Sequence, residues 1–279
     1  MGYWVCLIYS KIARKKICIW SGTTETSEQR SRNILLRFAK SLYIKNMNYG
    51  FAYGTEAKKF LIKNNLPSNK VFVIFNTSNL TPIRDAWKLR SDLAKQNDVP
   101  KIIFIGRLTK LKGVQHSLRT LSMLGRKDVK FRILGDGPYK NELQKLSKSL
   151  DLDSCVEFLG YMQQEQIIHH LVWADIFLFA TTQEVWGIVV NEALASGLYV
   201  LSSRLAGCTT DLIIEKFTGQ CIDPFDENQI LLALTETISN INEIRIERES
   251  RSLWAMKFST NKISEEFINA VDSILLKKK

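Results

Sequence analysis

The amino-acid sequence predicts an α/β protein built on parallel sheets, and three observations support this prediction. Short apolar runs alternate with helical patterns along most of the chain, as in sheets covered by helices on both faces. The longest runs, such as 71–75 and 176–180, have the length of strands and fall far short of the roughly 20 residues that cross a membrane. With 279 residues, of which 45% are hydrophobic, the chain can form two modest cores.

The expected elements fall into two groups, separated by the polar stretch 77–98. The first group has expected strands at 15–20, 49–54 and 70–76, with helices at 27–44 and 55–64. The second group has expected strands at 101–106, 129–135, 156–160, 176–180, 199–203 and 219–223 and helices at 113–124, 138–150, 163–171, 187–196 and 210–215. A helical tail covers 260–276. We therefore expect three parts: 1–96 (a partial first domain with a linker), 97–258 (a second domain) and 259–279 (a C-terminal helix).

Composition limits the classes of partner. The net charge of +11 favours polyanions such as phosphorylated molecules, an anionic membrane face or nucleic acid. The basic residues are spread along the chain without a nucleic-acid motif, so we expect no nucleic-acid partner. Five cysteines without CxxC pairing favour reduced, mostly buried thiols in the cytoplasm. At the start of the chain, the apolar stretch precedes the positive charges, which is the reverse of a secretion signal.

Two cations follow the first strand of the second group, in GRLTKLKG at 106–113. In doubly wound sheets, ligands bind beyond the carboxyl ends of the strands. Arg107 offers a planar fork and Lys112 a point charge, and the pair suits a diphosphate. Taken alone, the loop is more typical of two solvated surface cations.

A second candidate is EVWGIVVNEALASG at 184–197, which follows the strand 176–180. Glu184 precedes a helix, and Val185 to Ile188 form its first turn, where unpaired N–H groups favour an anion. Gly187 allows close approach of a ligand. Glu192 lies about one turn further, where a carboxylate can accept hydrogen bonds from a ribose. An ordinary amphipathic helix remains the alternative at this point.

Other residue types carry weaker signals. The GDGP segment at 135–138 indicates a tight turn before a helix. Asp151 and Asp153 form a D-x-D pattern, but the pattern lies in a turn away from the strand ends, so we expect no metal there. The three histidines fall on expected helices without zinc spacing, and we expect them to have surface or packing roles.

Five segments in order, GRLTKLKG, GDGP, VEFLGYM, EVWGIVVNEALASG and GQCIDPFD, resemble the nucleotide-sugar-binding domain of the retaining glycosyltransferases of family 4, the glycosyl transferases group 1. The resemblance covers nearly all of 99–258 and extends more weakly to 12–76. It implies the GT-B fold, in which two Rossmann-like domains face a cleft. It also implies transfer of a sugar from a nucleoside diphosphate sugar, with UDP the most common nucleotide, without metal or cofactor.

The resemblance also implies roles for individual residues. Arg107 and Lys112 would bind the donor diphosphate, Glu192 the ribose and Glu184 the donor sugar. The remaining positions would contribute backbone around the sugar and phosphate (Val185, Trp186, Gly187 and Ile188) or around the base (Gly160, Tyr161 and Met162).

The first domain departs from the family pattern, because only about 76 residues precede the linker against an expected 170 or so. The family's N-terminal glycine-rich loop is absent. Ser21 and Gly22 stand after a strand where relatives often carry a histidine. One hypothesis is a shortened but active hexosyltransferase of polysaccharide or glycoconjugate biosynthesis, lying against the inner membrane face and using a glycan or lipid-linked acceptor. The alternative is a donor-binding half or remnant that is inactive without a partner polypeptide. A basic nucleic-acid-binding protein is a third, weaker hypothesis.

Overall fold

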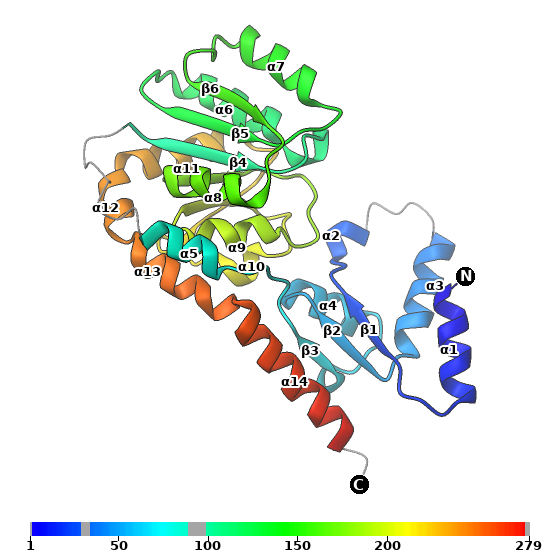
Figure 1. The fold of residues 1–279 in the computed structure, drawn as a ribbon. Coiled ribbons are helices and arrows are strands. Elements are labelled where there is room, and N and C mark those ends of the chain that lie inside the picture. Colours follow the sequence, from blue (N-terminus) through cyan, green and yellow to red (C-terminus); the bar gives the residue numbers. More distant parts are fainter. Residues whose placement is uncertain (1, 29–33, 89–98, 277–279) are drawn as a thin grey trace. The chain divides into compact units, whose positions relative to one another are not determined.

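The computed structural model describes residues 2–28, 34–88 and 99–276 (Figure 1). The chain divides into two compact units. Unit 1 combines Met1–Asn76 with Asn261–Lys279, and unit 2 is Thr77–Thr260. The C-terminal helix, which the sequence analysis treated as a separate part, therefore belongs to unit 1. The expected boundary at 96/97 lies outside the described residues.

Unit 2 contains a six-stranded parallel sheet with the strand order β6-β5-β4-β7-β8-β9. This is the doubly wound order of dinucleotide-binding folds, and it reverses direction between β4 and β7. The strands are β4 (Lys101–Ile105), β5 (Lys130–Leu134), β6 (Val156–Gly160), β7 (Ile176–Phe179), β8 (Tyr199–Ser203) and β9 (Gly219–Ile222). All six agree with the expected strands to within a few residues.

Two inner strands of this sheet are buried on both faces. Every residue of β7 and β8 is buried, because helices cover both sides of a parallel sheet. The flanking helices are α6 (Val114–Leu124), α7 (Lys140–Ser149), α8 (Gln164–Trp173), α9 (Ile188–Ala195), α10 (Thr209–Leu212) and α11 (Glu227–Ser239). The sequence analysis anticipated all of these except α11.

Several further helices of unit 2 were not predicted. They are α5 (Thr81–Lys88), α12 (Ile241–Ile246), α13 (Arg248–Ala255) and the 3-10 turn η4 (Met256–Phe258). Helix α5 lies inside the stretch that we interpreted as a linker, and it packs against α8 and α9. Its Ile83 and Trp87 are buried. The part of this stretch that precedes the undescribed residues is therefore folded onto unit 2.

A buried ion cluster joins α12 and α13 to the sheet at Asp175. The Arg245 guanidinium donates to both carboxylate oxygens of Asp175, at 3.1 and 2.8 Å. The backbone N–H of Lys101 donates to the same carboxylate at 3.0 Å, and Arg248 lies 3.8 Å from it. The side chain of Asp175 is only 6% exposed, so these partners compensate its loss of hydration.

Unit 1 contains a three-stranded parallel sheet with the order β1-β2-β3. Its strands are β1 (Cys18–Ser21), β2 (Tyr49–Ala52) and β3 (Val71–Val73). Its helices are α1 (Gly2–Ile12), α2 (Glu25–Glu28), α3 (Ile34–Lys45), α4 (Thr55–Lys63), the 3-10 turn η1 (Ser68–Lys70) and α14 (Thr260–Leu276). The helix expected at 27–44 corresponds to the end of α2 and most of α3, and its middle lies outside the described residues. Helix α1 was not predicted.

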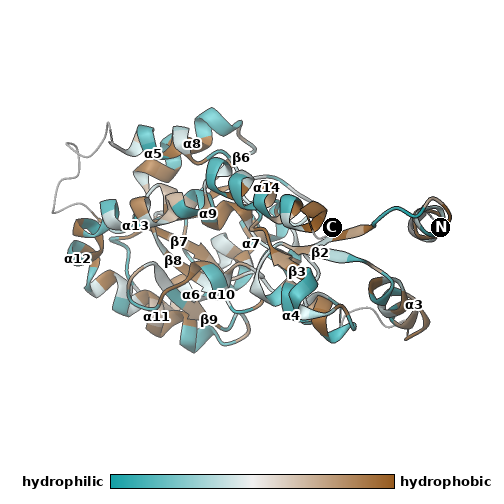
Figure 2. Ribbon diagram, turned by 90° about the horizontal axis from the view of Figure 1, so that it is seen from below, coloured by the Kyte–Doolittle hydropathy of each residue, from teal (hydrophilic) through white to brown (hydrophobic). Residues whose placement is uncertain are grey.

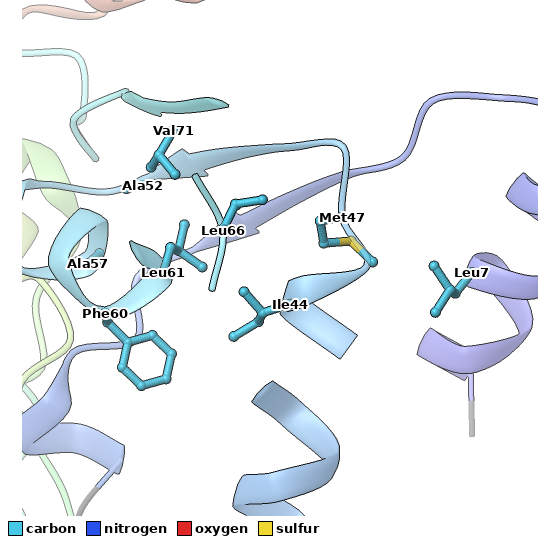
Figure 3. Packing of buried hydrophobic residues seen from close by; sticks show 9 residues of the cluster. All are labelled: Leu7, Ile44, Met47, Ala52, Ala57, Phe60, Leu61, Leu66 and Val71. Carbon is cyan, nitrogen blue, oxygen red and sulfur yellow. The ribbon is translucent and has the colours of Figure 1, made fainter. Parts of the chain in front are cut away.

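Two apolar clusters stabilise unit 1. In Figure 3, Leu7 of α1 and Ile44 of α3 belong to the cluster that also contains Phe60 and Leu61 of α4. The second cluster joins the sheet residues Phe51 and Ile74 to α14 through Ile263, Ala270 and Ile274.

The outer faces of α1 and α3 are apolar and exposed. On α1, Val5, Ile8, Tyr9 and Ile12 are between 58% and 78% exposed, and their spacing places them on one face. Helix α3 is largely brown, that is hydrophobic, in Figure 2. Its exposed apolar residues are Ile34, Leu35, Leu36, Phe38 and Leu42. A patch of this kind typically marks an interaction surface.

Two expectations from composition can be compared with the structure. In the described residues, no helix combines the length and the apolar character that crossing a membrane requires. All five cysteines are free thiols, but only Cys155 and Cys208 are buried, so the expectation of mostly buried cysteines was wrong. Cys6, Cys18 and Cys221 lie on elements near the surface of their units.

Candidate active site

The candidate residues of unit 2 gather where the strand order reverses. Arg107 and Lys112 follow β4, and Glu184 follows β7, which is the neighbour of β4 in the sheet. Because parallel strands end at the same edge, the two loops meet beyond the carboxyl ends of these strands. Thr182 joins them, since its backbone N–H and its hydroxyl both donate to the Leu111 carbonyl, at 2.8 and 3.1 Å.

Close backbone packing fixes the loop after β4. The loop passes through a 3-10 turn at Lys110–Lys112 and reaches Gly113, which has a φ of 72° and precedes α6. A Cβ atom at Gly113 would lie 1.7 Å from the Ala180 carbonyl oxygen. The two glycines of GDGP play the same role, since a Cβ at Gly135 would lie 1.9 Å from the Gly106 oxygen. The glycines therefore allow neighbouring strand ends to touch.

A pocket of about 400 Å³ opens beside Arg107. It brings this predicted phosphate ligand together with Tyr161 and Met162, which the resemblance assigns to the base. The Tyr161 side chain is 71% exposed and available for stacking. The full lining is Ile105, Gly106, Arg107, Leu134, Gly135, Asp136, Tyr161, Met162 and Ile167. The size falls within the range of small-molecule sites.

Asp136 lines the pocket and belongs to the GDGP segment, but the sequence analysis assigned no role to it. Its carboxylate accepts hydrogen bonds from Lys140 at 2.8 Å and from the Gly137 N–H at 2.7 Å. The Lys140 ammonium is the main reason that the pKa of Asp136 lies below its usual value. Asp136 therefore adds a negative charge to the pocket that already contains Arg107.

Lys112 and Glu184 form an ion pair with each other. Their side chains are 24% and 19% exposed, so the pair is largely shielded from solvent. The other carboxylate oxygen of Glu184 accepts from the Val185 N–H at 3.1 Å. The sequence analysis assigned Lys112 to the diphosphate and Glu184 to the sugar, and the structure places these two side chains in direct contact.

Gly187 and Trp186 fix the start of α9. Gly187 adopts a left-handed conformation (φ of 100°) immediately before the helix. The indole of Trp186 is buried and donates to Asn191 Oδ1 at 3.0 Å, which anchors the first turn from the core side. The helix begins at Ile188, so Val185 and Trp186 precede it and do not form its first turn as the sequence predicted. The Val185 N–H donates to Glu184, and the start of α9 at Gly187 and Ile188 is a potential anion site.

Glu192 lies one turn further along α9. Its carboxylate accepts a hydrogen bond from Ser78 Oγ at 3.0 Å. Burial raises the pKa of Glu192, and the Ser78 hydroxyl partly opposes this rise. Sequence reasoning missed Ser78, because it lies in the stretch interpreted as a linker and 114 positions from its partner.

The structure thus forms three groups from the predicted residues: Arg107 with Tyr161 and Met162, Lys112 with Glu184, and Glu192 with Ser78. Gly160 lies at the end of β6, next to Tyr161, and no atom lies within 4 Å of the position that a Cβ atom would take there. Asp151 of the D-x-D pattern belongs to none of these groups, and its carboxylate accepts a hydrogen bond from the Lys127 ammonium at 2.8 Å. Within the described residues, no cluster of three or more His, Cys, Asp or Glu could hold a metal ion.

The fold is a doubly wound parallel α/β sheet, and its candidate site lies at the strand switch point. The sequence model of the glycosyl transferases group 1 matches residues 85–251, so the chain belongs to that family.

Several curated relatives share part of the sequence. The chain is 28% identical over 214 residues to an uncharacterized glycosyltransferase of Methanocaldococcus jannaschii, covering 74% of this chain and 54% of that protein. It is 30% identical to the sulfoquinovosyl transferase SQD2 of Arabidopsis thaliana, covering 64% and 35%. It is 27% identical to an alpha-monoglucosyldiacylglycerol synthase of Streptococcus pneumoniae, covering 67% and 42%. The match thus spans between about a third and just over half of these proteins.

Solved structures confirm the fold. The Anabaena protein Alr3699/HepE, crystallised in complex with UDP, matches with a TM-score of 0.83 at 20% identity, covering 97% of this chain and 76% of that one. Sucrose-phosphate synthase from Thermosynechococcus elongatus matches with a TM-score of 0.79 at 17% identity, covering 99% and 72%. These neighbours are GT-B glycosyltransferases, so the prediction of an α/β, GT-B-like fold is confirmed.

Proposed function

We propose that this chain is the catalytic part of a retaining glycosyltransferase that uses a nucleoside diphosphate sugar, with UDP as the expected nucleotide. The observation that carries the proposal is the Lys112–Glu184 ion pair at the switch point, directly before the N-terminus of α9. A cation, a carboxylate and a helix N-terminus are the groups that a diphosphate joined to a sugar requires.

The donor would extend from the pocket at Arg107 to the start of α9. In this proposal the base stacks near Tyr161 and Met162, with backbone contacts near Gly160, and Arg107 and Lys112 bind the diphosphate. Glu192 accepts hydrogen bonds from the ribose. Glu184 accepts hydrogen bonds from the hydroxyls of the sugar once Lys112 has moved to the phosphates. The complex of HepE with UDP supports the choice of uridine.

These groups can promote transfer without a metal or a cofactor. The bond between the anomeric carbon and the diphosphate oxygen breaks, and negative charge develops on the leaving nucleotide. Fixed cations and the amides of Val185 to Ile188 stabilise that charge. The bond to the acceptor oxygen forms on the same face, and the acceptor proton passes to the leaving phosphate. This course retains the configuration of the sugar, and neither glutamate forms a covalent bond to it.

The acceptor is proposed to be a glycan or lipid-linked molecule of polysaccharide or glycoconjugate biosynthesis, not nucleic acid. The names of relatives support this class, since one is a monoglucosyldiacylglycerol synthase and another a phosphatidylinositol monomannoside mannosyltransferase. The net charge of +11 supports a cytoplasmic protein held peripherally at an anionic inner membrane surface.

The exposed apolar faces of α1 and α3 support a partner on the acceptor side. Strand β1 is at one edge of its sheet, and Trp20 on it is 52% exposed. An edge strand beside an apolar surface can accept further strands. We propose that an additional α/β polypeptide covers this surface during catalysis. This corresponds to the alternative hypothesis, in which the chain is a donor-binding half that needs a partner.

A transfer assay tests the proposed function. The purified chain is incubated in EDTA with UDP-glucose, UDP-galactose or UDP-N-acetylglucosamine and vesicles containing diacylglycerol, and NMR of the product gives the anomeric configuration. Slow release of UDP with an α-configured product supports the proposal, and fast transfer by the monomeric chain would remove the need for a partner. An inverted product, or a strict requirement for Mg²⁺, would contradict the proposed mechanism.

A further inference from the structure

Ser78 is the one hydrogen-bond donor found for the Glu192 carboxylate within the described residues. Its hydroxyl lies 3.0 Å from Oε1. Among the described residues of the elements packed against α9, no charged side chain shifts the pKa of Glu192. The carboxyl group therefore lies in a shielded position with a single neutral donor among the described residues, which leaves Oε2 available to a ligand.

The position of Ser78 is fixed by its neighbours in the chain. The hydroxyl of Thr77 donates to the Phe258 carbonyl at 2.5 Å, which ties the segment to η4. Leu80 is fully buried, and α5 begins immediately after it and packs against α9. Ser78 is thus held between two anchored points, and its hydroxyl approaches Glu192 from a rigid backbone.

We propose that Ser78 is a positioning residue for the ribose-binding carboxylate, and that recognition of the ribose hydroxyls depends on it. The inference rests on the proposed function, because it takes Glu192 as the ribose ligand. The Ser78 hydroxyl restricts the rotamer of Glu192 and stabilises the ionised form that accepts hydrogen bonds from a diol. A nucleoside diphosphate without ribose hydroxyls gains nothing from this arrangement.

The experiment compares UDP with its 2′,3′-dideoxy analogue by calorimetric titration in EDTA between pH 5 and 8. Ser78→Ala removes the hydroxyl, and Ser78→Thr retains one. Ser149→Ala is the matched control, because it removes a hydroxyl of the same unit that bonds to the Leu146 carbonyl within α7 and not to Glu192. Circular dichroism and unfolding temperature verify that each variant is folded.

Ser78→Ala is expected to weaken UDP binding by roughly three- to tenfold, as the loss of one hydrogen bond to a buried carboxylate does. Binding of the dideoxy analogue stays within about twofold of the unsubstituted protein. The pKa of Glu192 rises further without the hydroxyl, so the loss of UDP binding on acidification begins at a higher pH. Ser78→Thr restores most of the affinity, and Ser149→Ala leaves the ratio of the two affinities unchanged.

Two failures can be told apart. If the unsubstituted chain binds UDP better than the analogue, and Ser78→Ala weakens both equally or neither, the role of Ser78 is overturned and the proposed function stands. If the unsubstituted chain binds no nucleoside diphosphate, the proposed function is overturned together with this inference.

Discussion

Unit 2 and unit 1 are both parallel α/β structures, but they differ in how well they bury their apolar surface. Unit 2 has six strands, and its inner strands β7 and β8 are covered on both faces. Unit 1 has three strands, and two of its helices present apolar outer faces to solvent. The comparison indicates that unit 2 buries its apolar sheet within itself, whereas unit 1 exposes apolar helix faces of the kind that mark an interaction surface.

The largest expected effect tests whether close backbone contact fixes the loop 106–113 that follows β4. Gly113→Ala places a Cβ atom 1.7 Å from the Ala180 carbonyl oxygen at a φ of 72°. We expect it to destabilise unit 2 by about 3 kcal/mol or more and to abolish nucleotide binding. Gly125→Ala is the control, since φ is 66° there and nothing lies within 4 Å. It should cost about 1 kcal/mol in denaturant unfolding, and equal losses would contradict the packing argument.

The next effect compares ion pairs in the two units. Asp175→Ala leaves Arg245 and Arg248 without their shared buried carboxylate, so we expect the free energy of unfolding to fall by about 3–5 kcal/mol. In unit 1, Lys63 and Glu25 form a pair whose side chains are 64% and 41% exposed. Lys63→Ala should therefore cost less than about 1 kcal/mol. Similar unfolding midpoints for the two variants would show that the Asp175 cluster does not anchor α12 and α13.

A smaller effect sharpens the assignment of Glu184. The structure pairs its carboxylate with Lys112, so UDP must compete with Glu184 for this cation. Glu184→Gln should strengthen UDP binding by roughly two- to fivefold and weaken binding of UDP-sugar relative to UDP. Titration of both ligands into this variant checks the prediction. Unchanged UDP affinity would indicate that Lys112 does not reach the diphosphate.

The smallest effect concerns the decrease in the free energy of unfolding that the buried carboxylate of Glu192 causes. Burial raises its pKa in the folded chain, so the folded state binds more protons than the unfolded state between the usual and the raised pKa. The free energy of unfolding therefore falls as pH rises through that window. At pH 7, Glu192→Gln should raise the melting temperature by about 1–2 °C, and the gain should vanish at pH 4. A gain that persists at pH 4 would exclude ionisation as its cause.

Much of unit 2 could be predicted from the sequence, because its signals are local. The apolar run 176–180 has strand length, and a helix begins at Ile188, directly after Gly187. Helix α5 was missed although Ile83 and Trp87 are four positions apart, since the polar residues around them dominated the pattern. Helix α1 was also missed, although its exposed apolar face has a helical period.

The contacts within the candidate site could not be predicted in the same way. Ser78 bonds to Glu192 across 114 positions, and Lys112 pairs with Glu184 across 72. No sequence period connects residues so far apart, and only the order of the strands brings them together. The sequence could therefore name the charged groups but not their partners.

The most direct test of the account is a calorimetric titration of UDP, in EDTA, into the 279-residue chain and into Arg107→Ala. Arg107 lines the pocket beside β4, so its loss should weaken UDP binding by roughly tenfold or more with the fold retained. Arg119→Ala is the control, because Arg119 is a surface cation of the same unit paired with Glu227. Binding that falls only in Arg107→Ala is the result that the account predicts. Absence of UDP binding, or equal affinity in all three proteins, would contradict a donor site at the strand switch point.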